Sequence, residues 1–206
     1  GLLVAPPDFR QGNSYRIIYI HVPAAVVALA GYYVMALAGA VSLIWRIKMA
    51  DITMRAVAPV GAVLTGIALL TGAIWGKPTW GAWWVWDARI TSMLILLFLY
   101  LGVVALFEAY ENKTAAARAC AVLTLVGTVN IPIIYKSVDW WYSLHQPASI
   151  KFTGESAIDS SMLYPLLLMI LAFYCLFAVT VLLNMRTELV WTHRESGWLK
   201  QWVGDA

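Results

Sequence analysis

Five long apolar runs constrain this chain more than any other feature. Each comes close to the roughly 20 residues that a helix needs to cross a hydrocarbon core of about 30 Å. Lipid offers no partner to a backbone N–H or C=O group, so such runs must be helices, and the missing period-two alternation argues against a barrel. The sequence therefore predicts an all-α integral membrane protein, one polytopic domain over 1–206 with a bundle of five transmembrane helices. The approximate spans are 23–45, 56–74, 90–107, 117–135 and 162–185.

The composition agrees with a chain that lives in the lipid bilayer. Hydrophobic residues make up 62% of it and charged residues 12%, whereas soluble domains average about 45–50% and 25%. The formal net charge is only +3, and the basic residues are scattered singly, which is not the pattern of a nucleic-acid-binding protein. Cys120 and Cys175 both fall inside apolar runs, where we expect them to be small packing residues.

Five crossings place the polar segments on two opposite sides of the membrane. Eight of the 14 Lys and Arg residues fall on one side and six on the other. Because cytoplasmic loops usually carry the excess of positive charge, the side with six is predicted to face outward. The outward side carries 1–16, 75–89 and 136–161, and the opposite side carries 46–55, 108–116 and 186–206.

A tryptophan-rich segment over 75–91 joins two of the predicted spans. It reads WGKPTWGAWWVWDARIT and holds five of the chain's 11 tryptophans. An aromatic belt at a membrane interface is the alternative interpretation, but a belt needs only one or two aromatic side chains per helix end. We therefore predict a flat surface for a large, flat and partly apolar ligand. If 80–87 is a short interfacial helix, then Trp80, Trp83, Trp84 and Asp87 share one face, beside Trp75 and Trp86.

Two of the three histidines lie on the same predicted side as this segment. His21 stands at or just before the start of the first span, which we expect to begin at Pro23, although a helix continuous from Ile17 with a kink is the alternative. His145 follows Trp140 and Trp141 in the second outward loop, over 136–161. The third, His193, lies in the opposite tail, where we expect a solvated side chain.

Two histidines from different segments suit the two axial positions of a six-coordinate haem iron. A structural zinc would need four ligands, and no CxxCH motif is present for covalent attachment of haem. Haem propionates need cations, and Arg89 is the best candidate because its fork can bind a carboxylate through two bonds. Asp87 could orient Arg89, cap the helix that starts near Ile90 or meet a partner. The other candidate cations are Arg16, Lys77 and Lys136.

The pattern WGxxWxxWWxWDxR resembles the haem-handling membrane proteins that carry a tryptophan-rich WWD domain. One histidine precedes it in IIYIHVPAA and another follows it in WWYSLHQ. Among these proteins the chain is most similar to the CcmC family, the haem exporter proteins C of bacterial cytochrome c maturation. The likeness covers nearly the whole chain, and related cytochrome c synthases carry a similar motif on larger chains.

The resemblance implies a protein of the bacterial inner membrane whose tryptophan segment faces the periplasm. It would hold non-covalent haem b and present it to the haem chaperone CcmE. The small protein CcmD and the ABC transporter components CcmA and CcmB would be its partners. The family usually has six spans, and we expect a first span to precede the GLLVAPP start. The expected haem-binding residues are His21 and His145 as axial ligands, with Trp75, Trp80, Trp83, Trp84, Trp86, Asp87, Arg89, Trp140 and Trp141 around them.

Two other functions predict features that the spans lack. A b-type cytochrome would carry histidines in mid-span, commonly in facing pairs, and the four spans after the first contain none. A solute permease would carry ionisable residues buried in mid-span, and we find none there. No catalytic triad and no phosphate-binding glycine loop is present, so any catalytic role would be limited to helping haem attach to the chaperone.

Overall fold

The computed structural model describes residues 1–141, 143–145, 158–194 and 196–197. Five helical stretches in this part are long and apolar enough to cross a membrane, one of them formed by α4 and α5 together. The all-α architecture and the five predicted spans are therefore confirmed. The elements are η1 (Asn13–Ile17), α1 (Ile18–Trp45), α2 (Lys48–Trp80), α3 (Ala88–Ala109), α4 (Lys113–Gly127), α5 (Asn130–Trp140) and α6 (Ser160–His193).

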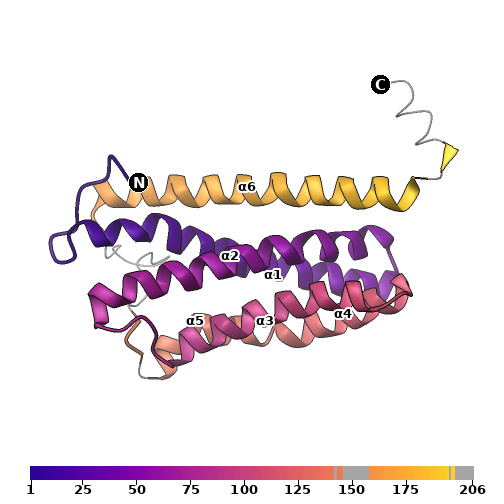
Figure 1. The fold of residues 1–206 in the computed structure, drawn as a ribbon, viewed down its shortest axis with the longest axis horizontal. Helices are drawn as coiled ribbons and strands as arrows, with labels where there is room; N and C mark the ends of the chain where they lie inside the picture. The colour runs from indigo at the N-terminus through magenta and orange to yellow at the C-terminus, as the bar shows by residue number, and fades with distance from the viewer. Residues whose placement is uncertain (142, 146–157, 195, 198–206) are drawn as a thin grey trace.

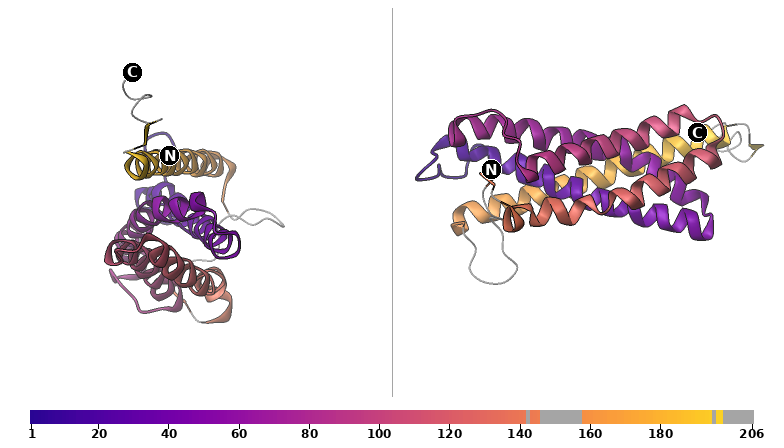
Figure 2. Two further views of the ribbon diagram at one scale, coloured as in Figure 1. Left: turned by 90° about the vertical axis from the view of Figure 1, so that its right-hand side faces the viewer. Right: turned by 90° about the horizontal axis from the view of Figure 1, so that it is seen from below.

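The helices α1 and α2 form the middle of the bundle. Figure 1 shows α6 on one side of this pair and α3, α4 and α5 on the other, and Figure 2 shows the same arrangement from two further sides. Small residues such as Ala24, Ala28, Ala58 and Ala62 are buried where these helices pack. Small side chains let helix backbones approach closely, which is how helices pack inside a membrane.

The predicted start of the first span at Pro23 is wrong, because α1 begins at Ile18 and contains Pro23. The alternative of a helix that runs continuously through the proline describes the structure. Pro23 is only the sixth residue of α1, so its missing N–H removes one intrahelical bond, to the carbonyl of Tyr19. As a consequence, His21 lies in the first turn of the helix, and the helical backbone fixes the direction of its Cα–Cβ bond.

The fourth span is interrupted between α4 and α5, at residues 128–129. Pro132 accounts for the interruption, because it has no N–H to donate to Thr128 and its ring crowds that carbonyl. The buried side chain of Asn130 donates from Nδ2 to the carbonyl of Ser92 at 2.8 Å. This bond ties the start of α5 to α3.

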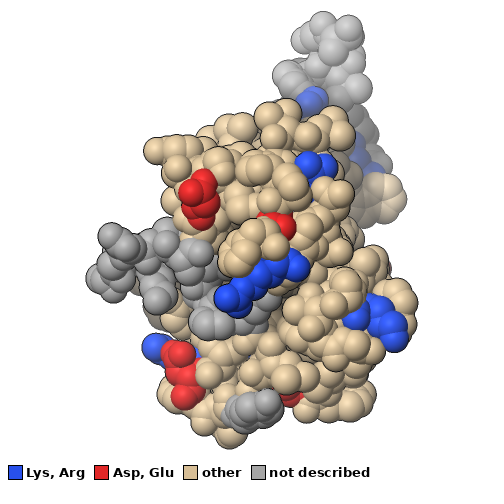
Figure 3. Space-filling model, turned by 90° about the vertical axis from the view of Figure 1, so that its left-hand side faces the viewer, with Lys and Arg blue, Asp and Glu red and all other residues tan. Residues whose placement is uncertain are grey.

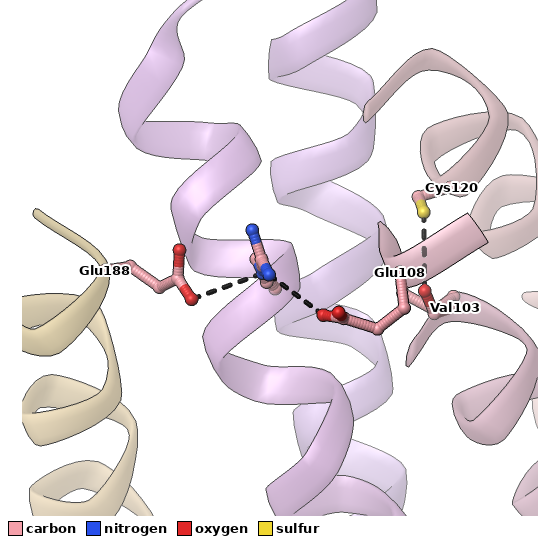
Figure 4. A network of polar contacts seen from close by, with 5 residues as sticks. Val103, Glu108, Cys120 and Glu188 are labelled. Carbon is pink, nitrogen blue, oxygen red and sulfur yellow. Dashed lines mark hydrogen bonds and ion pairs between the residues drawn. The ribbon is translucent and has the colours of Figure 1, made fainter. Parts of the chain in front are cut away.

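The end at which α2 passes into α3, formed by residues 75–91, is named the tryptophan end. The opposite end is held by Arg55 of α2, which forms ion pairs with Glu108 of α3 at 2.9 Å and with Glu188 of α6 at 3.2 Å (Figure 4). In the same region the thiol of Cys120 donates to the carbonyl of Val103 at 3.5 Å. The ion pairs join both outer layers to the central pair, and the thiol bond joins α4 to α3.

Gly61 of α2 offers a test of this packing. An added Cβ there would overlap the ring of Tyr100, which is fully buried and donates its hydroxyl to the carbonyl of Ala28 at 2.7 Å. We expect Gly61→Ala to lower the free energy of unfolding by about 1–3 kcal/mol, as overpacking does. Gly66→Ala on the same helix meets nothing within 4 Å and is the control. Equal thermal unfolding of the two variants in detergent would contradict this packing.

Candidate functional site

A cavity of about 490 Å³ lies at the tryptophan end, between α1, α2, α3, α5 and α6. Its walls are mostly apolar, with Val22 and Leu29 from α1, Met93 from α3 and Ile170 from α6. Ligand sites of this size usually combine apolar walls with a few convergent polar groups. The predicted site residues that line the cavity are His21, Trp75, Trp80, Trp83, Trp84, Arg89 and His145.

His21 is oriented by two acceptors on α2. Its Nδ1 lies 2.9 Å from the carbonyl oxygen of Ala68 and 3.2 Å from the hydroxyl oxygen of Thr71. A carbonyl can only accept, and the Thr71 hydroxyl already donates to the carbonyl of Ile67 at 2.6 Å, so Nδ1 is the nitrogen that carries the proton. In a neutral ring the lone pair then resides on Nε2, the arrangement that a metal-binding imidazole requires.

Close packing around His21 depends on a glycine and on an aromatic cluster. A Cβ added at Gly72 would lie 3.0 Å from Cε1 of His21, so the ring rests directly against α2. Trp75 meets the His21 ring edge to face, with centroids 5.8 Å apart. Trp75 is itself held by Gln11, whose side-chain oxygen accepts from its indole N–H at 2.7 Å, and by the ring of Tyr15 at 5.7 Å.

His145 lies outside any helix and is held by the first turn of α3. Arg89 NH1 lies 3.3 Å from Nδ1 of His145. A guanidinium has only donors, so Nδ1 accepts and the imidazole is neutral, with its proton on Nε2. Arg89 also donates to the carbonyl of Tyr135 at 3.0 Å and to the hydroxyl of Ser137 at 3.4 Å, so it joins α3, α5 and the His145 segment.

The two histidines face each other across the cavity. Their ring centroids are 6.2 Å apart, with an angle of 34° between the planes. Trp80 lies beside His145, with centroids 6.1 Å apart. Two side chains that are 124 residues apart in the sequence therefore lie close together at the cavity. They are in opposite neutral tautomers, because His21 carries its proton on Nδ1 and His145 carries its proton on Nε2.

The expected short helix over 80–87 is wrong. Helix α2 continues to Trp80 and ends at Gly81, whose φ of 80° is a left-handed conformation that glycine adopts readily. Residues 81–87 then form a connection without helix. Asp87 does not share a face with the tryptophans; it caps α3 by accepting the N–H of Ile90 at 2.8 Å. Of its three proposed roles, capping is confirmed.

Three of the predicted tryptophans point elsewhere. Trp86, Trp140 and Trp141 are 74%, 59% and 52% exposed, and none of them lines the described part of the cavity. Helix α5 ends at Trp140, so Trp141 does not sit on a helix with His145. The remainder of the expected loop over 136–161 lies partly outside the described residues.

Of the four candidate cations, only Arg89 reaches the described walls of the cavity. Arg16 donates to the carbonyl of Ala5 at 2.9 Å, and Lys77 donates to that of Gly81 at 3.1 Å. Lys136 forms an ion pair with Asp139 at 3.2 Å. Figure 3 views this end and shows a few charged side chains, some of them adjacent and of opposite sign, on a largely neutral surface.

Comparison with known proteins gives close matches over almost the whole chain. The family model described as "Heme exporter protein C" matches residues 1–200. The heme exporter protein C of Escherichia coli K12 is 47% identical over 203 residues, covering 98% of this chain and 82% of the relative. That of Bradyrhizobium diazoefficiens is 50% identical over 187 residues, covering 91% and 71%. A putative ccmC-like mitochondrial protein of cytochrome c biosynthesis from Marchantia polymorpha is 44% identical over 183 residues, covering 89% and 77%.

The contact between Gly72 and His21 makes the site testable by substitution. In Gly72→Ala the added methyl group pushes the His21 ring away from the carbonyl of Ala68 by a few tenths of an ångström. If His21 binds haem, as the sequence predicts, the affinity for haem falls about tenfold, as it does when the support of a metal ligand is lost. Gly66→Ala, which meets nothing within 4 Å, is expected to keep the original affinity. Haem titration followed by absorbance decides between them, and equal affinities would show that the close contact does not position the ring.

Proposed function

The chain belongs to the heme exporter protein C family, and on this premise we propose that it binds haem between His21 and His145 and hands it to the chaperone CcmE. It is a multi-pass membrane protein with a role in cytochrome c biogenesis. Haem b is its non-covalent cargo. The tryptophan end faces the periplasm in this proposal, which agrees with the distribution of Lys and Arg between the two sides.

The spacing of the two imidazoles is the observation that carries the proposal. Metal–imidazole bonds are about 2 Å long, so two rings on opposite faces of one iron have centroids roughly 6 Å apart. The centroids of His21 and His145 are 6.2 Å apart. Rings that only pack also lie about 4.5–7 Å apart, so the spacing supports axial ligation of a single iron because both rings also line the same cavity.

The aromatic walls supply what a porphyrin needs besides its ligands. Trp75, Trp80, Trp83 and Trp84 line the cavity with flat, largely apolar surface, and aromatic side chains of this size dominate the energetics of apolar contacts. The indole N–H of Trp84 is buried and has no acceptor within the described part of the chain. It is therefore a donor that a carboxylate of the cargo could satisfy, beside Arg89.

Arg89 has two roles in the proposed binding step. While it donates to Nδ1 of His145, the proton of that ring is on Nε2, and Nε2 has no lone pair for a metal. For haem to bind, the His145 ring would give its Nε2 proton to water and take a proton from water at Nδ1, so the N–H of Arg89 would have to leave. The released guanidinium can then bind a propionate through two bonds. His21 needs no such change, because its Nδ1 already carries the proton.

The proposed transfer depends on where the site lies. Both histidines are at one end of the bundle, where Trp83, Trp86, Trp140 and Trp141 are exposed, so a partner in the periplasm could reach the cargo. A b-type cytochrome that carries electrons across the membrane would need haem nearer the middle of the bilayer. Interaction with CcmD, CcmA and CcmB is proposed from membership of the family.

Substitution of the histidines tests the proposed ligation. We expect His21→Ala and His145→Ala each to lower haem affinity by about 10- to 100-fold, because each removes an axial bond. His193→Ala, in the last turn of α6 at the opposite end of the bundle, is the matched control and should leave haem content unchanged. Haem per protein is measured by absorbance after purification, and unchanged content in both site variants would refute the proposal.

A further inference from the structure

The described residues beside His145 form no regular secondary structure that would hold its side chain in place. The segment that carries His145 follows α5, which ends at Trp140, and residues 141 and 143–145 belong to no helix or strand. His21, in contrast, is fixed by the first turn of α1. Within the described residues, bonds to neighbouring elements hold His145 opposite His21.

One carboxylate connects this segment to α3. Oδ1 of Asp87 accepts the N–H of Ile90, and Oδ2 accepts the hydroxyl of Ser143. The same Ser143 oxygen accepts the backbone N–H of His145 at 3.0 Å. A continuous path of hydrogen bonds thus runs from the start of α3 to the backbone of His145.

The carboxylate is well placed to hold the segment firmly. Asp87 is 9% exposed, and hydrogen bonds to a charged group are stronger than those between neutral groups, particularly away from water. Its two oxygens serve two different elements, so the helix cap fixes the direction in which Oδ2 points. Arg89, two residues further on, holds the imidazole ring itself.

We infer that Asp87 and Ser143 are positioning residues that set the place of His145 opposite His21. The inference rests on the proposed function, in which His145 is an axial ligand of haem. Asp87 acts on the backbone of His145 through Ser143, while Arg89 acts on the ring. The aspartate of the tryptophan-rich segment therefore contributes to the site without lining the cavity.

A measurement without haem tests the connection directly. Diethyl pyrocarbonate modifies accessible imidazoles, and mass spectrometry of the full chain in detergent resolves His145 from His21. Ser143→Ala removes both bonds of the hydroxyl, and we expect modification of His145 to become about tenfold faster while that of His21 stays the same. Ser143→Thr keeps a hydroxyl and should restore the original rate. An unchanged rate at His145 in Ser143→Ala would overturn the inference.

The start of α6 provides a matched control. Asp159 there accepts the N–H of Ser161 at 2.9 Å and its hydroxyl at 2.6 Å, so it is also an aspartate–serine pair at a helix start. Ser161→Ala should leave the reactivity of both histidines unchanged. Asp87→Asn separates the two roles of Asp87, because asparagine still caps a helix well but has only one side-chain oxygen. Faster modification of His145 in this variant supports the positioning role, and an unchanged rate would show that Asp87 only caps α3.

A second measurement connects the inference to haem. In Ser143→Ala we expect the absorbance spectrum of bound haem to shift from six-coordinate low-spin toward five-coordinate high-spin, and added imidazole should restore the low-spin form. If Ser143→Ala keeps a fully low-spin spectrum, His145 does not depend on the connection and the inference fails. If the unsubstituted chain takes up no haem through its histidines, the proposed function fails, while the pyrocarbonate rates still decide whether Asp87 and Ser143 hold His145.

Discussion

In the proposed site, two imidazoles that come from very different supports must lie at the spacing of two axial ligands of one iron. His21 projects from the first turn of a transmembrane helix, and His145 projects from a segment without helix. Their centroids are nonetheless 6.2 Å apart. The neighbouring contacts serve this spacing: Ala68, Thr71 and Gly72 fix the first ring, and the first turn of α3 fixes the second.

The two histidines differ in how firmly their rings are held. The proton on Nδ1 of His21 is fixed by acceptors on α2, so this ring can bind a metal without rearrangement. His145 must exchange a bond to Arg89 before it can do so. Transfer of haem to another protein requires an axial ligand that can dissociate. In the proposed function we therefore expect the bond between His145 and the iron to break before the bond between His21 and the iron.

The bilayer explains why so much could be predicted from the sequence. Lipid allows only helices and closed barrels, and continuous apolar runs without period-two alternation leave the helical architecture. The WGxxWxxWWxWDxR pattern between two histidines indicates the family. The local geometry of the site was harder to predict from the sequence. The helix expected over 80–87 rests on spacing alone, whereas Gly81 ends α2. The roles of Gln11, Thr71 and Ser143 arise from tertiary contacts between distant segments, and nothing in their local sequence indicates them.

Electron paramagnetic resonance of the haem-loaded protein, prepared with ¹⁵N-labelled histidine, tests the central claim most directly. If imidazoles of this chain occupy both axial positions, the signal is low-spin ferric with couplings from two histidine nitrogens. Because only histidine carries the ¹⁵N label, the couplings of its nitrogens can be told apart from those of the four porphyrin nitrogens. A high-spin signal, or a low-spin signal with a coupling from only one histidine, would contradict the claim that His21 and His145 bind the same iron.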